Sequence, residues 1–166
     1  NESLANFVAI AANEQFFVQR VAACKRDPSG DCSVVESMLR AARNDAAVQY
    51  DLSNGVQALY AALDALYKDP SLSSDEKVAR REAVFSQYVT PLRSKYPQLQ
   101  ALRQVNNAEI MQLKIYLTDL GLFREIFERV GGNWGAFFAQ MGEIRAQRDV
   151  DGSLDAFELL RAKARG

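Results

Sequence analysis

The sequence predicts an all-α fold, a single domain over residues 1–166 built as an irregular, partly orthogonal bundle of about seven to eight helices with short loops. Three observations predict it. Apolar residues recur every three or four positions, and no stretch of four to eight residues alternates in the manner of a strand. Capping and turn residues follow one another at helix-length intervals. The chain has 166 residues, 48% of them hydrophobic and 25% charged, as expected of one globular domain.

The first predicted helix runs from Ser3 to about Arg26. Its apolar residues form a stripe at helical spacing with a second stripe beside it, so we expect a wide buried face. The main stripe consists of Phe7, Ile10, Phe17, Val21 and Cys24. Glu14 falls on this stripe, and we expect it at the exposed edge, with a buried ion pair as the alternative. The run 27–30 contains a proline and a glycine and ends the helix.

Two further helices are expected before residue 70. Ser33 and Glu36 have the spacing of a capping box, which predicts a helix start at Ser33. The run 51–55 combines Asp, Ser, Asn and Gly and predicts a break or a kink. The helix after it, from about Ser53 to Lys68, has the most regular apolar period in the chain: Val56, Leu59, Tyr60, Leu63, Leu66 and Tyr67.

A second capping box, formed by Ser73 and Glu76, begins the following helix. Pro91 is expected to kink this helix or end it near Thr90, because proline lacks the backbone N–H and clashes with the preceding turn.

Pro97 suits the first turn of a long helix that we expect to reach about Leu120. This segment is apolar on several sides, which predicts a central helix packed by neighbours all round. Asn106 and Asn107 interrupt its apolar stripe. A buried Asn at this point would fix the packing register or cap a kink.

Three short helices complete the prediction. Gly121 suits the C-terminal end of the central helix, and an apolar helix follows over about 122–130. The break 131–133 contains two glycines, and a helix then runs from Trp134 to about Arg148. Ser153 is expected to cap the last helix. The sharp breaks at 91–97 and 131–132 favour a partly orthogonal bundle over a plain four-helix coil.

Two cysteines, Cys24 and Cys32, flank the first predicted turn. Their spacing is not that of a zinc or redox motif, and two ligands cannot build a structural zinc site. We expect a disulfide across a helix–loop–helix corner, with two reduced cysteines as the alternative. A disulfide would place the protein in an oxidising compartment, namely the bacterial periplasm, the cell surface or the exterior. The chain begins at Asn1 rather than Met, so we expect a processed protein or a fragment without its targeting segment.

Charge is segregated along the chain although the net charge is only -1. Residues 44–76 carry a net charge of -5, and residues 77–103 carry +5. Consecutive antiparallel helices can pair these charges or expose them to solvent. The alternative is a basic docking face for an acidic partner, for which the candidate residues are Arg80, Arg81, Arg93 and Lys95. Nucleic acid is not an expected partner, because the chain is slightly acidic and has few interleaved aromatic residues.

The segment 147–158 resembles an EF-hand loop, in which clustered oxygens hold calcium. Gly152 takes the turn position, and Asp149, Asp151, Asp155 and Glu158 fall at ligand positions. Gln147, however, stands where a carboxylate normally anchors the ion. The alternative is a helix-ending turn followed by a capped helix, with Asp155 and Glu158 near the N-terminal dipole. We expect this alternative, and therefore no cofactor, with calcium at 147–158 as the second choice.

No reactive constellation is evident elsewhere. The chain has no histidine, which excludes Ser-His-Asp and Cys-His triads and histidine-ligated zinc or haem. The carboxylates Glu109, Asp119, Glu125 and Glu128 show no sign of the facing pair a glycosidase needs. Trp134 is expected to fill the core, with an interface anchor at the glycine-rich hinge as the alternative.

These observations predict a non-enzymatic, periplasmic or secreted helical module that binds another protein of the cell envelope or secretion pathway. Inhibitor or immunity proteins, assembly factors and chaperones are examples of the class. A small-ligand or calcium-binding helical domain using residues 147–158 is the alternative function. No apolar run reaches the ~18 residues of a membrane span, so none is expected.

Overall fold

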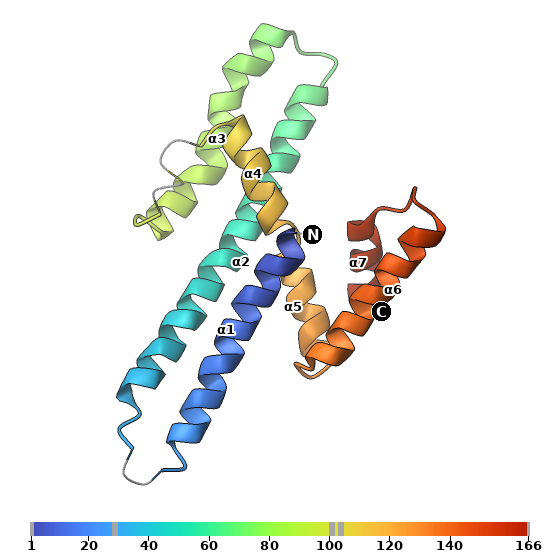
Figure 1. The fold of residues 1–166 in the computed structure, drawn as a ribbon. Helices are drawn as coiled ribbons and strands as arrows, with labels where there is room; N and C mark the ends of the chain where they lie inside the picture. Colours follow the sequence, from blue (N-terminus) through green and yellow to red (C-terminus); the bar gives the residue numbers. More distant parts are fainter. Residues whose placement is uncertain (1, 28–29, 100–101, 103–104, 166) are drawn as a thin grey trace. The chain divides into compact units, whose positions relative to one another are not determined.

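The structure is a computed structural model that describes residues 2–27, 30–99, 102 and 105–165. The predicted all-α class is confirmed, since the described residues form helices joined by short loops and no strand (Figure 1). The helices are α1 (Glu2–Cys24), α2 (Ser33–Lys68), α3 (Ser74–Lys95), α4 (Asn107–Leu117), α5 (Leu120–Arg129), α6 (Trp134–Val150) and α7 (Ala156–Arg165). In this part of the chain, none of them has the length and apolar character required to cross a bilayer.

The chain divides into two compact units, Asn1–Thr118 and Asp119–Gly166. The N-terminal unit contains α1 to α4, and the C-terminal unit contains α5 to α7. We describe each unit by itself. The single domain over residues 1–166 stays a prediction.

An antiparallel hairpin of α1 and α2 is the frame of the N-terminal unit (Figure 1). With 36 residues at 1.5 Å each, α2 extends for about 54 Å. Of the break or kink predicted at 51–55, the break is wrong, because α2 is continuous through these residues. Gly55 faces α3, where an added Cβ would lie 2.7 Å from Cδ1 of Leu92. The small residues that resemble a turn in the sequence therefore serve close packing within a helix.

The helix start predicted at Ser33 is confirmed, but the capping of α2 differs from the prediction. Cys32 is the N-cap residue, without a side-chain capping bond, so Ser33 and Glu36 do not form a capping box. Glu36 instead pairs with Lys25 across the turn, at 3.0 Å. The second predicted box is confirmed, since Ser73 caps α3 reciprocally with Glu76.

Pro91 lies inside α3, so the helix end predicted near Thr90 is wrong. The turn after the proline is held by other bonds. The N–H of Tyr96 donates to the carbonyl of Leu92 at 2.8 Å, and the side chains of Lys95 and Tyr96 both bond Asp51 of α2. A proline in a helix removes one hydrogen bond, and these contacts offset that loss.

The long helix predicted from Pro97 to Leu120 is also wrong, because α4 begins only at Asn107. The side chain of Asn106 accepts hydrogen bonds from the N–H groups of Ala108 (2.9 Å) and Glu109 (3.2 Å). The Glu109 carboxylate accepts in return from the Asn106 N–H at 2.9 Å. Asn106 therefore caps a helix start. The pattern Asn-x-x-Glu is the sequence signal for it.

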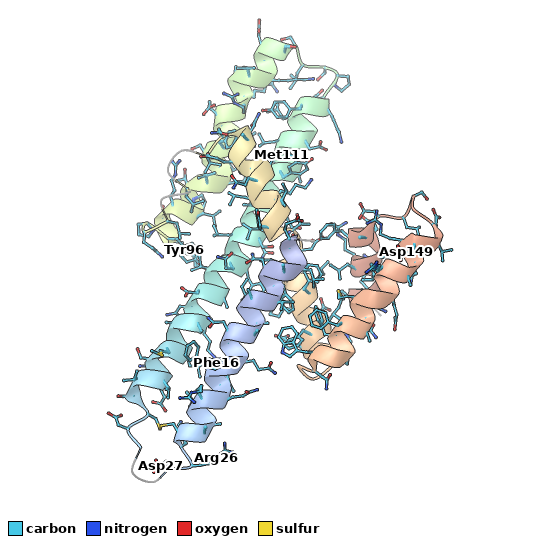
Figure 2. All side chains as sticks on the ribbon, in the orientation of Figure 1. Phe16, Arg26, Asp27, Tyr96, Met111 and Asp149 are labelled. Atoms are coloured by element: carbon cyan, nitrogen blue, oxygen red, sulfur yellow. A yellow bond between two sulfur atoms is a disulfide. The ribbon has the colours of Figure 1, made fainter. Side chains whose placement is uncertain are left out.

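The core of the N-terminal unit lies between α2, α3 and α4. It contains the buried residues Leu59, Leu63, Phe85, Val89, Leu102 and Ile110. Towards the disulfide, α1 packs on α2 as a two-helix hairpin, and apolar residues such as Phe17 and Leu39 are only half-buried there. Exposed Phe16, labelled in Figure 2, belongs to this part of α1.

The C-terminal unit packs α5, α6 and α7 around Phe123, Phe127, Phe137 and Leu160. Asp119 precedes α5 with a left-handed φ of 56°, so the helix boundary falls there and not at Gly121, which lies inside α5. The predicted cap Ser153 is also corrected. Asp155 caps the last helix by accepting from the N–H groups of Phe157 and Glu158.

Candidate functional site

A cavity of about 520 Å³ opens on α4 in the N-terminal unit. Its volume lies within the range of ~300–1,000 Å³ typical of ligand sites. We call it the α4 pocket, and it is lined by Asn6, Gln49, Leu52, Leu99, Leu102, Glu109, Gln112, Leu113, Tyr116 and Leu117. Five leucines supply apolar walls, and three carboxamides and one carboxylate supply polar groups. This combination is typical of a site that buries an apolar group and fixes its orientation with a few hydrogen bonds.

The wall formed by the end of α4 is fixed by side chains from α1 and α2. The last carbonyls of a helix lack partners inside the helix. Here the hydroxyl of Ser3 donates to the carbonyl of Ile115 at 2.8 Å, and the hydroxyl of Ser53 donates to the carbonyl of Leu117. Thr118 donates through both its N–H and its hydroxyl to the preceding carbonyl of Lys114. The pocket wall is therefore preformed.

Asn6 contributes to both the wall and the pocket. Its Nδ2 donates to the carbonyl of Tyr116 at 3.1 Å, and the residue lines the cavity. This bond fixes the carboxamide at the pocket edge, since only limited rotation preserves it. Gln49 and Gln112 place two more carboxamides at the cavity from α2 and α4.

Glu109 is the one ionisable carboxylate among the described lining residues. It is half-buried in the first turn of α4, where the helix dipole favours a negative charge. Its Oε2 is held by the N–H of Asn106. The sequence marks Glu109 only as one of several helical carboxylates, and its neighbours in the pocket come from distant segments.

Apolar surface continues from the pocket along α4. Met111, Ile115 and Tyr116 expose 51%, 51% and 47% of their surface, respectively. Met111 is labelled on α4 in Figure 2. Exposed large apolar side chains close to a pocket are typical of surfaces that contact other molecules.

The four predicted basic docking residues all lie on α3, in two groups. Arg80 and Arg81 are separated from Arg93 and Lys95 by about 20 Å along the helix. Lys95 pairs with Asp51, and the Nε of Arg93 donates to the carbonyl of Leu102. At the C-terminal end of α3, the basic segment is therefore paired with the acidic segment of the same chain. A docking role for these residues stays a prediction.

The contact of Asp51 with Lys95 and Tyr96 shifts the pKa values of the charged groups involved. Hydrogen bonds from both side chains lower the pKa of Asp51, and the same carboxylate raises the pKa of Lys95. Arg81 pairs with its neighbour Glu82 at 2.9 Å, which raises the pKa of the guanidinium. Both basic groups thus have acidic partners within the N-terminal unit.

Trp134, the predicted core residue or interface anchor, lies half-buried at the edge of an aromatic cluster in the C-terminal unit. Its ring centroid is 4.3 Å from that of buried Phe127 and 5.9 Å from that of Phe138, on which it stacks. Phe138 is 47% exposed. Trp134 thus joins the core to an exposed ring, and its role as an anchor stays a prediction.

The carboxylates of 147–158 make separate local contacts. Asp149, labelled in Figure 2, pairs with Arg145 at 3.7 Å. The hydroxyl and the N–H of Ser153 donate to Asp151, and these bonds lower the pKa of Asp151. The backbone N–H groups that Asp155 caps lower the pKa of Asp155. Among the described residues, no three His, Cys, Asp or Glu side chains gather to hold a metal ion. Calcium binding at this segment stays a prediction.

The remaining candidate carboxylates are paired with cations. Glu14 accepts from the Nε of Arg43 at 2.9 Å and is partly exposed, which fits the predicted stripe edge with an added ion pair. Glu125 and Glu128 pair with arginines one turn away on α5. Buried Asp119 pairs with Arg161 of α7 at 2.7 Å, yet burial raises its pKa.

Cys24 and Cys32 form the predicted disulfide, with their Cα atoms 5.8 Å apart. The bond joins the end of α1 to the residue that precedes α2. It closes the tip of the hairpin, far along the chain from every residue that lines the α4 pocket.

One comparison identifies a related family. A family model described as "Putative aminopeptidase" matches residues 1–152 of the chain. No curated protein and no solved structure matches it. The description names an enzyme activity, whereas the sequence predicts a module without catalysis.

Proposed function

Because the chain belongs to the family described as "Putative aminopeptidase", we propose that it is a helical peptide-binding portion of such a protein. In this proposal the α4 pocket binds an apolar segment of another protein or peptide. The chain supplies recognition, and it does not supply the groups that react.

The residues favour binding over catalysis. Some aminopeptidases use a pair of metal ions about 3.5–4 Å apart, held by carboxylate and imidazole ligands. The chain has no histidine, and its described carboxylates gather in no metal-binding group. Such a metal pair does not fit these residues, and we derive no catalytic step through it.

The α4 pocket is the observation that carries the proposal. Its leucines would bury an apolar side chain, which contributes about 1.5–3 kcal/mol for a residue such as Leu or Phe. Its carboxamides offer donors and acceptors that match a peptide backbone. Because Ser3, Asn6 and Ser53 already fix the wall at the end of α4, little ordering would accompany binding.

The compartment forms part of the proposal. A disulfide at the hairpin tip supports a periplasmic or secreted location, since such bonds persist in oxidising compartments. The partner we propose is accordingly a protein or peptide of the cell envelope or secretion pathway.

Binding of fluorescent apolar peptides tests the proposal, with the dissociation constant measured by anisotropy. Leu113→Gln places a polar group in the pocket wall, and we expect it to weaken binding about tenfold. Val78→Gln is the control, because Val78 is an exposed apolar residue on α3 that does not line the pocket. Equal weakening by both variants, or no binding to the parent chain, would overturn the proposal.

A further inference from the structure

The exposed side of α4 carries no charged residue. All positions of this helix belong to the described part of the chain, and the exposed ones are Asn107, Ala108, Met111, Gln112, Ile115 and Tyr116. On α3, by contrast, the exposed positions include Asp75, Arg80 and Glu82. The side of a helix that stays in water is normally polar and charged. This side of α4 therefore has the composition of a surface that another molecule covers.

The exposed residues of α4 form two rows along the helix. Met111 and Ile115 are one turn apart, as are Gln112 and Tyr116, so each pair forms a ridge. We call these four residues the α4 ridges. Gln112 and Tyr116 also line the α4 pocket, so the ridges and the pocket are continuous. The groove between two such ridges is the place where side chains of a second helix pack.

The backbone of the partner decides between a helix and an extended peptide. An extended segment has unpaired N–H and C=O groups, and these groups lose water when they are buried against apolar side chains. The described residues form no strand whose edge could pair with such a segment. A helix pairs its backbone groups internally. The ridge formed by Met111 and Ile115 therefore favours a helical partner.

The α4 pocket suits the end of such a helix. The terminal turns of a helix leave backbone groups without partners inside the helix. Asn6, Gln49 and Gln112 line the pocket, and their carboxamides can donate to or accept from these groups. The pocket thus complements a helix end, and the α4 ridges complement the turns next to it.

We propose that the α4 ridges and the α4 pocket together bind an amphipathic helix of a partner protein, which packs an uncharged apolar side on Met111 and Ile115. This inference rests on the proposed peptide-binding function and specifies the form of the ligand. The apolar residues of the partner recur at the spacing i, i+3, i+4 and i+7. With 11 residues, α4 is about 16 Å long, so about three turns of the partner cover it.

The probes are three acetylated peptides with a fluorophore at the C-terminus. The helical peptide contains two copies of Leu-Gln-Lys-Leu-Leu-Glu-Gln, which places leucine on one side of a helix. The alternating peptide contains two copies of Leu-Gln-Leu-Lys-Leu-Glu-Gln, which has the same composition in the period of a strand. The third is the helical peptide with proline in place of the Gln that joins its two repeats, because proline breaks the helix.

We expect the helical peptide to bind the parent about tenfold more tightly than either of the other two, with anisotropy as the measurement. Its circular dichroism should gain helical signal on binding. Met111→Gln and Ile115→Gln each remove apolar surface that the helix would cover, and each should weaken its binding about fivefold. Val78→Gln, at an exposed apolar position of α3, is the control and should leave the affinity unchanged. Thermal unfolding of the variants checks that they remain folded.

The outcomes separate this inference from the function on which it rests. If the alternating peptide binds the parent as tightly as the helical one, the helical form of the partner is wrong while peptide binding stands. If Met111→Gln and Ile115→Gln bind the helical peptide like the parent, the α4 ridges are not the contact surface and the inference fails. If none of the peptides binds the parent, the proposed function fails as well.

Sedimentation of the chain alone tests the competing occupant of this surface, which is a second copy. We expect a monomer. A dimer that Ile115→Gln converts to a monomer would show that a second copy covers the α4 ridges, and it would overturn the inference.

Discussion

The hydroxyl of Ser53, completely buried in the middle of α2, donates a hydrogen bond to the carbonyl oxygen of Leu117 at the end of α4. The two residues are 64 positions apart in the chain. Together with Ser3 and Asn6, Ser53 supplies the partners that the last carbonyls of α4 lack within the helix.

Ser53→Ala should therefore destabilise the protein by about 1–3 kcal/mol, because it leaves the Leu117 carbonyl without this buried donor. The free energy of unfolding in urea measures the loss. Ser94→Ala, an exposed position on α3, is the control and should change stability by less than about 0.5 kcal/mol. An equal effect of the two substitutions would contradict the role given to Ser53.

The close contact between Gly55 and Leu92 predicts a coupling between the two positions. Alanine stabilises a helix interior by about 1 kcal/mol relative to glycine, but a Cβ at position 55 would press against Leu92. Gly55→Ala should therefore be more favourable in a Leu92→Ala background than in the parent chain. A double-mutant cycle of unfolding free energies measures the difference. Additive effects would show that the contact has no energetic consequence.

Reduction of the hairpin disulfide should lower the free energy of unfolding by about 2–3 kcal/mol, since a short closed loop restricts the unfolded chain. Unfolding in urea with and without dithiothreitol measures this loss. The double variant Cys24→Ser, Cys32→Ser should have the stability of the reduced protein and no response to the reductant. A response of the double variant would point to an effect unrelated to the disulfide.

Asp119 and Asp51 should have opposite effects on stability as pH changes. Burial raises the pKa of Asp119 above its ordinary value of 3.8, so the folded state binds its proton more tightly than the unfolded state does. The contribution of Asp119 to stability is therefore largest below pH 3.8 and falls as pH rises through the folded pKa. Asp119→Asn should accordingly cost less at pH 7 than at pH 4. The fluorescence of Trp134, the one tryptophan in the chain, reports unfolding of the C-terminal unit.

The pH dependence of the stability that Asp51 contributes should have the opposite sign. Its lowered pKa means that the pair with Lys95 stabilises the fold above pH 3.8 and is lost as pH falls through the folded pKa. Asp51→Asn should therefore cost more at pH 7 than at pH 3, by a small amount because the pair is largely exposed. Urea unfolding followed by far-UV circular dichroism measures the loss of unfolding free energy at each pH. The same pH trend for both variants would contradict this assignment.

Helical periodicity was sufficient to predict the fold class, whereas several helix boundaries depend on distant contacts. Gly55 and Pro91 are helix breakers by local criteria, yet both lie inside helices. Gly55 packs closely against Leu92 of α3. The turn that follows Pro91 is held by the bonds of Lys95 and Tyr96 to Asp51. At Asn106 the capping signal was present in the sequence, but apolar residues on both sides suggested a longer helix.

The disulfide was predictable because its two residues lie close together in the chain and flank one turn. The α4 pocket was not, because α1, α2, α4 and the segment before α4 each contribute to it. No local pattern marks Asn6 and Glu109 as neighbours of one cavity. Only the packing of α4 across the hairpin brings these side chains together.

The disulfide at the hairpin tip has a consequence for proteolysis. The peptide between Cys24 and Cys32 contains Lys25 and Arg26, which trypsin-like proteases cut. A single cut there leaves both fragments joined through the sulfur atoms, with α1 still paired to α2. Such damage would release no fragment until the protein met a reductant, so the intact and the nicked chains would migrate together on a non-reducing gel.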